Sequence, residues 1–149
     1  MSFAKPSLKG RALRLLSGRE HSRAELERKL TPFEEEPGTL AKALDALQAK
    51  GFISEQRVIE SVLNRRAARF GASRIKYELL NKGVAAQAVA EAVSGLKATE
   101  LERAREVWRK KFGERAQDAQ AAAKQMRFLA ARGFGGEVIN RVVAHAHED

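Results

Sequence analysis

Residues that lie 50 positions apart in this chain match in type, and this internal repeat constrains the fold more than any other feature. The apolar and glycine positions that match are Leu79, Gly83, Val89 and Val93, which correspond to Leu129, Gly133, Ile139 and Val143. Repeats of this length are typical of stacked supersecondary units, because one unit alone cannot bury its apolar face. A chain of 149 residues has room for three such units.

Helix-starting and helix-ending residues divide each predicted unit into three helices. Ser22 with Glu25, and Thr99 with Glu102, form capping-box patterns, in which each side chain can accept a hydrogen bond from a free backbone N–H. Glycines that follow apolar stripes predict left-handed helix ends, at Gly51, Gly83 and Gly133. The third helix of each unit has an apolar stripe, formed by Leu40/Leu44/Leu47, Val89/Val93/Leu96 and Ile139/Val142/Val143.

We therefore predict an all-α protein. It consists of three tandem three-helix, helix-turn-helix-like repeats in an elongated arrangement, within a single repeat domain over residues 1–149. The predicted repeats are residues 8–52, residues 53–97 and residues 98–147.

Charge follows the same repeat and gives the chain a formal net charge of +9. Three blocks carry a net charge of +5 each, at residues 1–30, 50–83 and 97–132, and they hold 26 of the 28 basic residues. The intervening segments carry −3, −1 and −2. One basic surface per unit predicts an anionic partner, either nucleic acid or an acidic protein surface.

Composition excludes several classes of protein and site. No Cys is present, which excludes a disulfide framework and a Cys nucleophile. Charges interrupt every apolar run, and the N-terminus lacks a signal-peptide core, so we predict a cytoplasmic protein without membrane spans. His21, His145 and His147 are too scattered for a metal site, and Glu34–Glu36 fix no catalytic geometry. We therefore predict no enzyme, no cofactor, no metal and no catalytic residue.

Basic residues of the second and third units are the candidate binding residues, because Lys and Arg neutralise phosphates and release counterions. The alternative is that they form the solvated faces of amphipathic helices. The candidates are Arg65, Arg66, Arg69, Arg74, Lys76, Arg105, Arg109, Lys110, Lys111, Lys124 and Arg127.

Aromatic residues adjoin several of these cations and can serve either of two purposes. Stacking on exposed bases is one reading. Helical spacing from other apolar residues favours core packing for Trp108, Phe112 and Phe128. For Tyr77 the sequence does not decide between the two roles.

A set of short motifs runs along the chain from Arg11 onward: Arg11-Ala12-Leu13, Ser22-Arg23-Ala24-Glu25-Leu26, Gly51-Phe52-Ile53-Ser54, Arg74-Ile75 with Glu78-Leu79, Lys82-Gly83-Val84, Gln125-Met126-Arg127-Phe128-Leu129 and Arg132-Gly133-Phe134. In their order and spacing these motifs resemble the RecX family of bacterial regulators of the RecA recombinase. The chain departs from the family pattern at Glu55, where Asp is expected, at Val58-Ile59, where Phe-Ala is usual, and at Gly135, where Ser commonly begins the last helix.

The resemblance implies a non-enzymatic protein of three three-helix repeats that binds the RecA–DNA filament. Such a protein inhibits RecA: it limits filament extension and lowers ATPase and strand-exchange activity, which places it in recombination, DNA repair and the SOS response. We expect it to be a monomer that contacts RecA together with single- and double-stranded DNA. The alternative is a helical DNA-binding protein, either a transcription factor or an architectural protein, that acts independently of RecA.

Overall fold

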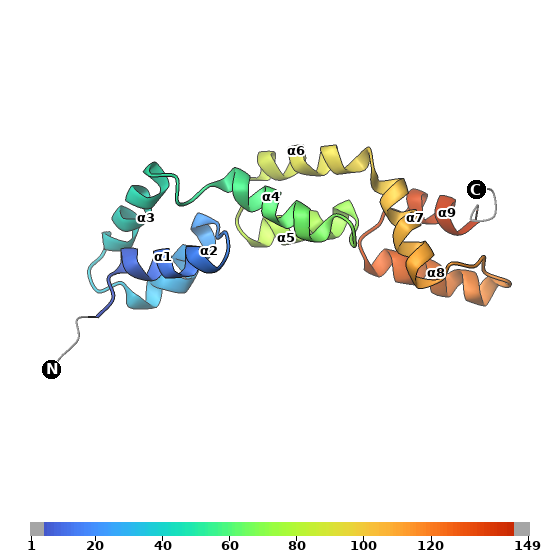
Figure 1. Cartoon of the computed structure of the whole chain (residues 1–149), viewed down its shortest axis with the longest axis horizontal. Helices are drawn as coiled ribbons and strands as arrows, with labels where there is room; N and C mark the ends of the chain where they lie inside the picture. The colour runs from blue at the N-terminus through green and yellow to red at the C-terminus, as the bar shows by residue number, and fades with distance from the viewer. Residues whose placement is uncertain (1–4, 145–149) are drawn as a thin grey trace. The chain divides into compact units, whose positions relative to one another are not determined.

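The described residues, 5–144, form an all-helical structure, seen here in a computed structural model (Figure 1). They contain nine α-helices, one short 3₁₀ helix and no strand. The elements are α1 (Leu8–Gly18), α2 (Arg23–Leu30), η1 (Thr31–Phe33), α3 (Thr39–Ala49), α4 (Glu55–Arg66), α5 (Ala72–Asn81), α6 (Ala86–Lys97), α7 (Glu100–Lys111), α8 (Ala119–Ala131) and α9 (Gly136–Ala144). The predicted all-α fold is confirmed.

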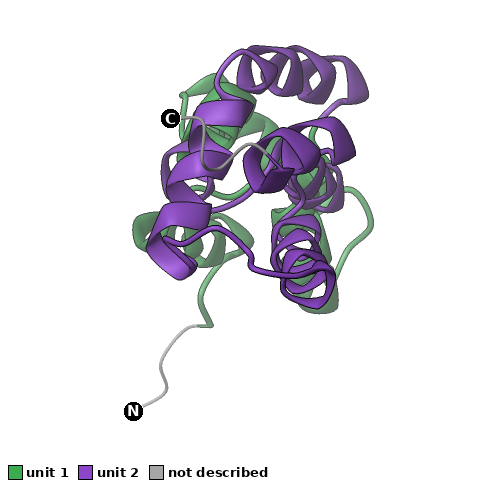
Figure 2. Ribbon diagram, turned by 90° about the vertical axis from the view of Figure 1, so that its right-hand side faces the viewer, with its two compact units in different colours: residues 1–61, 82–84 green, residues 62–81, 85–149 purple. Residues whose placement is uncertain are grey.

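The chain divides into two compact units (Figure 2). Unit 1 contains residues 1–61 and 82–84, and unit 2 contains residues 62–81 and 85–149. The division cuts through α4 and therefore does not coincide with a predicted repeat boundary. The three predicted repeats each span three α-helices over the described residues, and their boundaries stay a prediction.

Unit 1 has its own apolar core. The predicted stripe of α3 is buried there, together with residues of α1 and α2 and one residue of the loop between α3 and α4: Ala12, Leu26, Leu30, Leu40, Leu44, Leu47 and Ile53. The predicted capping box at the start of α2 is present, since Ser22 accepts a hydrogen bond from the Glu25 N–H and Glu25 accepts one from the Ser22 N–H, both at 3.0 Å. Local sequence signals therefore place α2 correctly.

Unit 2 has a second core between α7, α8 and α9. Its buried members are Ala104, Val107, Trp108, Leu129, Phe134, Ile139, Val142 and Val143. The Trp108 indole donates a hydrogen bond to Gln125 at 2.9 Å, which satisfies its polar N–H inside the core. Phe112 and Phe128 pack against this core edge to face, with ring centroids 5.4 Å apart. The predicted packing role of all three aromatics is confirmed.

The predicted capping box at Thr99 and Glu102 is wrong. The Thr99 side chain caps no N–H of α7; instead it donates to the Leu96 carbonyl at 3.3 Å and accepts from Arg103 at 3.0 Å. With φ −112° and ψ 2°, Thr99 is not in the extended conformation that a side-chain N-cap requires. The acidic residue of this turn that does cap a helix is Glu100, and it caps α5 rather than α7.

Candidate nucleic-acid interface

Phe70, in the loop between α4 and α5, is the centre of a cluster of arginines. Its side chain is buried, and four guanidinium groups lie over the ring within cation–π distance. Their distances to the ring centroid are 4.6 Å for Arg74, 5.3 Å for Arg132, 5.5 Å for Arg66 and 5.9 Å for Arg69. The four arginines near this ring come from α4, α5, the loop between them and the end of α8, all within unit 2.

Glycines allow the loop to approach the α8–α9 turn closely. The Gly71 N–H donates a hydrogen bond to the Arg132 carbonyl at 2.8 Å, and a Cβ at Gly71 would lie 2.3 Å from the Gly133 carbonyl oxygen. Gly133 has φ +89°, and a Cβ there would lie 2.4 Å from the Cβ of Arg74. Only glycine fits both positions, so backbone packing brings Arg132 to the Phe70 ring.

Arg103 of α7 also binds the loop between α4 and α5. Its guanidinium donates to the carbonyls of Ala67 and Phe70, both at 2.8 Å, and to that of Leu96 at 3.0 Å. Burial lowers the pKa of Arg103, and the nearby Glu100 carboxylate opposes this effect. These bonds end α4 and fix the loop that carries Arg69 and Phe70.

A shallow groove of about 370 Å³ lies beside this loop, and we call it the basic groove. Its lining residues come from the loop, α7 and α8: Ala68, Arg69, Val107, Lys110, Lys111, Phe128 and Arg132. Four of these seven are cations and none is acidic. In the described part of the chain, none of the four forms an ion pair with a carboxylate, so their charges are available to an anion.

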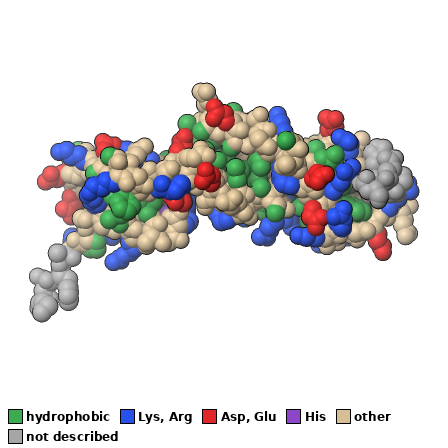
Figure 3. Space-filling view, turned by 45° about the horizontal axis from the view of Figure 1, so that its top comes forward, with side chains coloured by type: hydrophobic (Ala, Val, Ile, Leu, Met, Phe, Trp, Pro, Cys, Tyr) green, Lys and Arg blue, Asp and Glu red, His purple; other side chains and the backbone are tan. Residues whose placement is uncertain are grey.

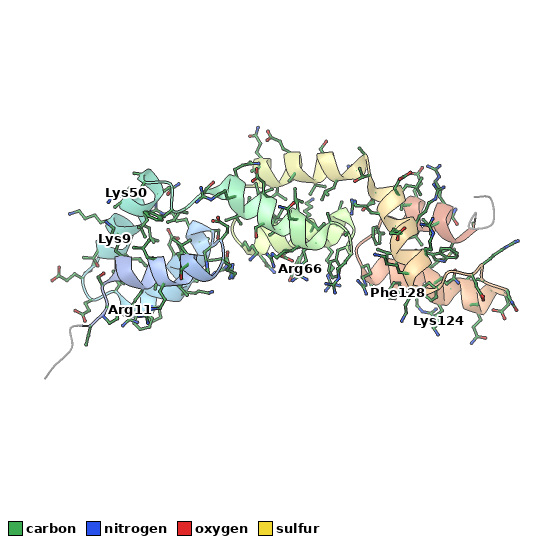
Figure 4. All side chains as sticks on the ribbon, in the orientation of Figure 1. Lys9, Arg11, Lys50, Arg66, Lys124 and Phe128 are labelled. Atoms are coloured by element: carbon green, nitrogen blue, oxygen red, sulfur yellow. The ribbon has the colours of Figure 1, made fainter. Side chains whose placement is uncertain are left out.

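Phe128, labelled on α8 in Figure 4, orients two of these cations. Lys111 Nζ lies 5.4 Å from the centroid of its ring, and the Arg132 guanidinium lies 5.0 Å from it. Because cations lie over this ring and Phe112 packs against it, the ring serves to position charge rather than to stack on a base. This arrangement suits phosphate, which needs several converging donors.

The structure brings three of the eleven candidate residues into the basic groove: Arg69, Lys110 and Lys111. Lys124 and Arg127 are exposed on α8, and Arg105 is half-buried on α7. Lys76 lies on α5 at a different groove. Arg132 is a groove residue that the sequence reasoning missed, because its place before Gly133 was interpreted only as a helix end.

The other four candidates, like Arg105, interact with groups of the fold. Arg65 and Arg66 share the Glu78 carboxylate, at 3.8 and 3.2 Å. Arg109 pairs with Glu106 at 2.6 Å, and Arg74 donates to the Ala131 carbonyl at 2.9 Å. The residues with carboxylate partners contribute less net charge to the surface than the sequence alone indicates.

Unit 1 also neutralises part of its basic block internally. Arg19 pairs with the buried Glu25 at 2.8 Å, and Arg23 pairs with Asp45 at 2.6 Å. On the face shown in Figure 3, basic and acidic side chains are interspersed. These arginines of unit 1 are neutralised by carboxylates, whereas, among the described residues, the four cations of the basic groove in unit 2 are not.

No group of His, Asp and Glu side chains suited to a metal ion occurs among residues 5–144. His21 is buried, with Nδ1 3.1 Å from the Arg19 carbonyl and Nε2 accepting from Lys29 at 3.0 Å. His145 and His147 lie outside the described residues. None of the described helices is long and apolar enough to cross a bilayer.

The fold defines a class: helical proteins built from three-helix units, and in this chain unit 2 carries a groove lined by four cations. Family models agree, since the first three-helix domain of RecX matches residues 9–47 and the third matches residues 98–143. The chain is 52% identical to a regulatory protein RecX of Leptothrix cholodnii, over 95% of this chain and 92% of that protein. It is 48% identical to a regulatory protein RecX of Herminiimonas arsenicoxydans, over 100% and 99% of the two chains.

This chain belongs to the RecX family of regulatory proteins. The family is non-enzymatic, which confirms the prediction that the chain is not an enzyme. A crystal structure of RecX from Lactobacillus salivarius has the same fold, with a TM-score of 0.79 over 95% of this chain and 96% of that chain, although the two sequences are only 19% identical.

Proposed function

We propose that this chain inhibits RecA by binding the RecA–DNA filament, where it limits filament extension and lowers ATPase and strand-exchange activity. Membership of the RecX family supports this partner. The observation that carries the proposal is the basic groove, in which Arg69, Lys110, Lys111 and Arg132 converge without a carboxylate. Such a surface binds the phosphodiester backbone, single- or double-stranded, regardless of base sequence.

Inhibition in this proposal is a shift of populations. A protein that binds one state of the filament more tightly than another favours that state by its difference in affinity. If the favoured state turns over ATP slowly, or has an end that no longer adds protomers, ATPase and extension both fall. The protein acts as a monomer in the cytoplasm, where its partner binds chromosomal DNA, and its role belongs to recombination, DNA repair and the SOS response.

The test is RecA ATPase and filament extension on single-stranded DNA, with this protein added below the RecA concentration. Wild type is compared with the double variant Lys110→Gln/Lys111→Gln and with a matched control, Lys42→Gln/Lys50→Gln, which removes two exposed charges of unit 1. We expect wild type and the control to inhibit, and the groove variant to need about tenfold more protein.

Unchanged ATPase and extension with wild type would refute the proposal. DNA binding that persists without any effect on RecA would instead favour the alternative, a helical DNA-binding protein that acts independently of RecA. A footprint on a defined sequence would separate a transcription factor from an architectural protein, because an architectural protein binds without base discrimination.

A further inference from the structure

A second groove lies between α5 and α6 in unit 2, and its chemistry differs from that of the basic groove. We call it the α5–α6 groove; it has a volume of about 360 Å³. Its main lining residues are Lys76, Leu80, Val89, Ala90, Val93 and Lys97. Leu80 leaves 44% of its surface exposed, which is high for a large apolar side chain.

The charges of the α5–α6 groove lie at one end. The chain reverses direction between α5 and α6, so the start of α5 and the end of α6 lie at the same end of this helix pair (Figure 1). Lys76 and Lys97 therefore lie away from the connecting turn, whereas Leu80 and Ala86 lie next to it. Both ionisable lining residues are lysines, and no lining residue is acidic.

This pattern fits a protein partner better than DNA. Surfaces that bind DNA are strongly positive, and four of the seven residues that line the basic groove are cations, against two of the eight that line the α5–α6 groove. Protein interfaces combine an apolar centre with polar and charged residues at the edge, and the α5–α6 groove combines apolar lining residues with charge at one end. A segment that fills it needs apolar side chains over Leu80 and Val93 and carboxylates near Lys76 and Lys97.

We propose that the α5–α6 groove binds an acidic amphipathic segment of the RecA protein itself, so that protein and DNA are contacted through separate surfaces. This inference rests on the proposed function. A second copy of this chain fits less well, because each copy carries a net charge of +9 and would bring the two lysines to a like-charged partner. Charge complementarity therefore selects an acidic occupant.

The decisive variant is Leu80→Asp, which removes the apolar contact and places a carboxylate opposite an acidic segment. Leu80 is exposed enough for the fold to tolerate the change, which circular dichroism verifies. A second variant, Lys76→Gln/Lys97→Gln, removes the charges at the basic end. The matched control is Gln87→Asp, at an exposed position of α6 outside the groove lining.

Two quantities are measured for each variant: affinity for a fluorescent single-stranded DNA without RecA, and the protein concentration that halves RecA ATPase. We expect Leu80→Asp to keep its DNA affinity and to require about tenfold more protein for inhibition, because loss of an apolar interface anchor commonly costs that much. The lysine variant shifts in the same direction by less, and Gln87→Asp behaves as wild type.

Three results overturn this inference while leaving the proposed function in place. Leu80→Asp could inhibit RecA as well as wild type, or its DNA affinity could fall in parallel with inhibition. Sedimentation equilibrium without RecA could also show dimers that Leu80→Asp dissociates, which would assign the groove to a second copy. A wild-type protein that leaves RecA unaffected refutes the proposed function, and this inference with it.

Discussion

Glu100 of α7 accepts a hydrogen bond at 2.7 Å from the backbone N–H of Ala72, the first residue of α5 and 28 positions earlier in the chain. The first N–H groups of a helix have no partner within it, so a buried helix start requires an external acceptor. At the start of α2 the N–H of the N-cap residue Ser22 is bound by Glu25 at 3.0 Å. The start of α2 is thus capped by a carboxylate of the same helix, whereas the start of α5 is capped by a carboxylate of α7.

Removing the Glu100 carboxylate should destabilise unit 2. In Glu100→Ala the buried Ala72 N–H loses its acceptor, and we expect the free energy of unfolding to fall by about 1–3 kcal/mol. Urea denaturation followed by circular dichroism measures this. Glu102→Ala, at an exposed position of the same helical turn, is the control and should change stability by less than about 0.5 kcal/mol. Equal effects of the two substitutions would contradict the capping role.

Gly133 should not tolerate a side chain. Gly133→Ala forces a residue with a Cβ to adopt φ +89° and brings that Cβ to 2.4 Å from the Cβ of Arg74, so we expect a loss of about 2 kcal/mol or more. Gly136→Ala is the matched control: it begins α9, has open space around it, and should be neutral or slightly stabilising. Melting temperatures compare the two. An unchanged melting temperature for Gly133→Ala would disprove the close approach.

Stability should fall at low pH because of Glu25. Burial opposes ionisation of this carboxyl, but hydrogen bonds from Arg19 and the Ser22 N–H, with the charges of Lys82 and Arg19, lower its pKa from 4.5 to about 2. The resulting stabilisation, about 3 kcal/mol, is present above about pH 4.5 and is lost as the pH falls towards about 2.

Urea denaturation between pH 7 and pH 2 checks this dependence on Glu25. Glu25→Gln keeps a side-chain oxygen as acceptor for the Ser22 N–H but cannot ionise, so most of the pH dependence in this range should disappear. Glu27→Gln, at an exposed position of the same helix, should retain the wild-type profile. Identical profiles for wild type and Glu25→Gln would contradict the prediction.

The basic groove should dominate the salt dependence of DNA binding. Each phosphate contact to single-stranded DNA contributes a slope of about 0.7 in log affinity against log salt concentration. Lys110→Gln/Lys111→Gln should therefore lower the slope by up to about 1.4, whereas Lys42→Gln/Lys50→Gln should leave it nearly unchanged. Fluorescence anisotropy at several salt concentrations measures the slopes. Equal slopes for the two double variants would show that the groove does not contact phosphate.

Local signals in the sequence correctly predicted the capping box of α2 and most of the buried positions in the apolar stripes. The Ser22–Glu25 capping box and the buried stripe of Leu40, Leu44 and Leu47 depend on residues three or four positions apart, which a helix brings together whatever surrounds it. Thr99 and Glu102 have the same spacing but form no box, because Thr99 is not extended and interacts with Leu96 and Arg103 instead. The spacing of two residues along the chain does not show whether other groups compete for their side chains.

The sequence by itself determined that the chain is helical and basic and that it belongs with the RecX-like repeats, since these properties depend on periodicity, charge and short motifs. Tertiary structure decided which cations remain unpaired. Glu78 of α5 forms ion pairs with Arg65 and Arg66 of α4. Arg132 lines the basic groove together with Arg69, Lys110 and Lys111. These partners come from different helices, so their distances depend on how the helices pack and not on their separation along the chain.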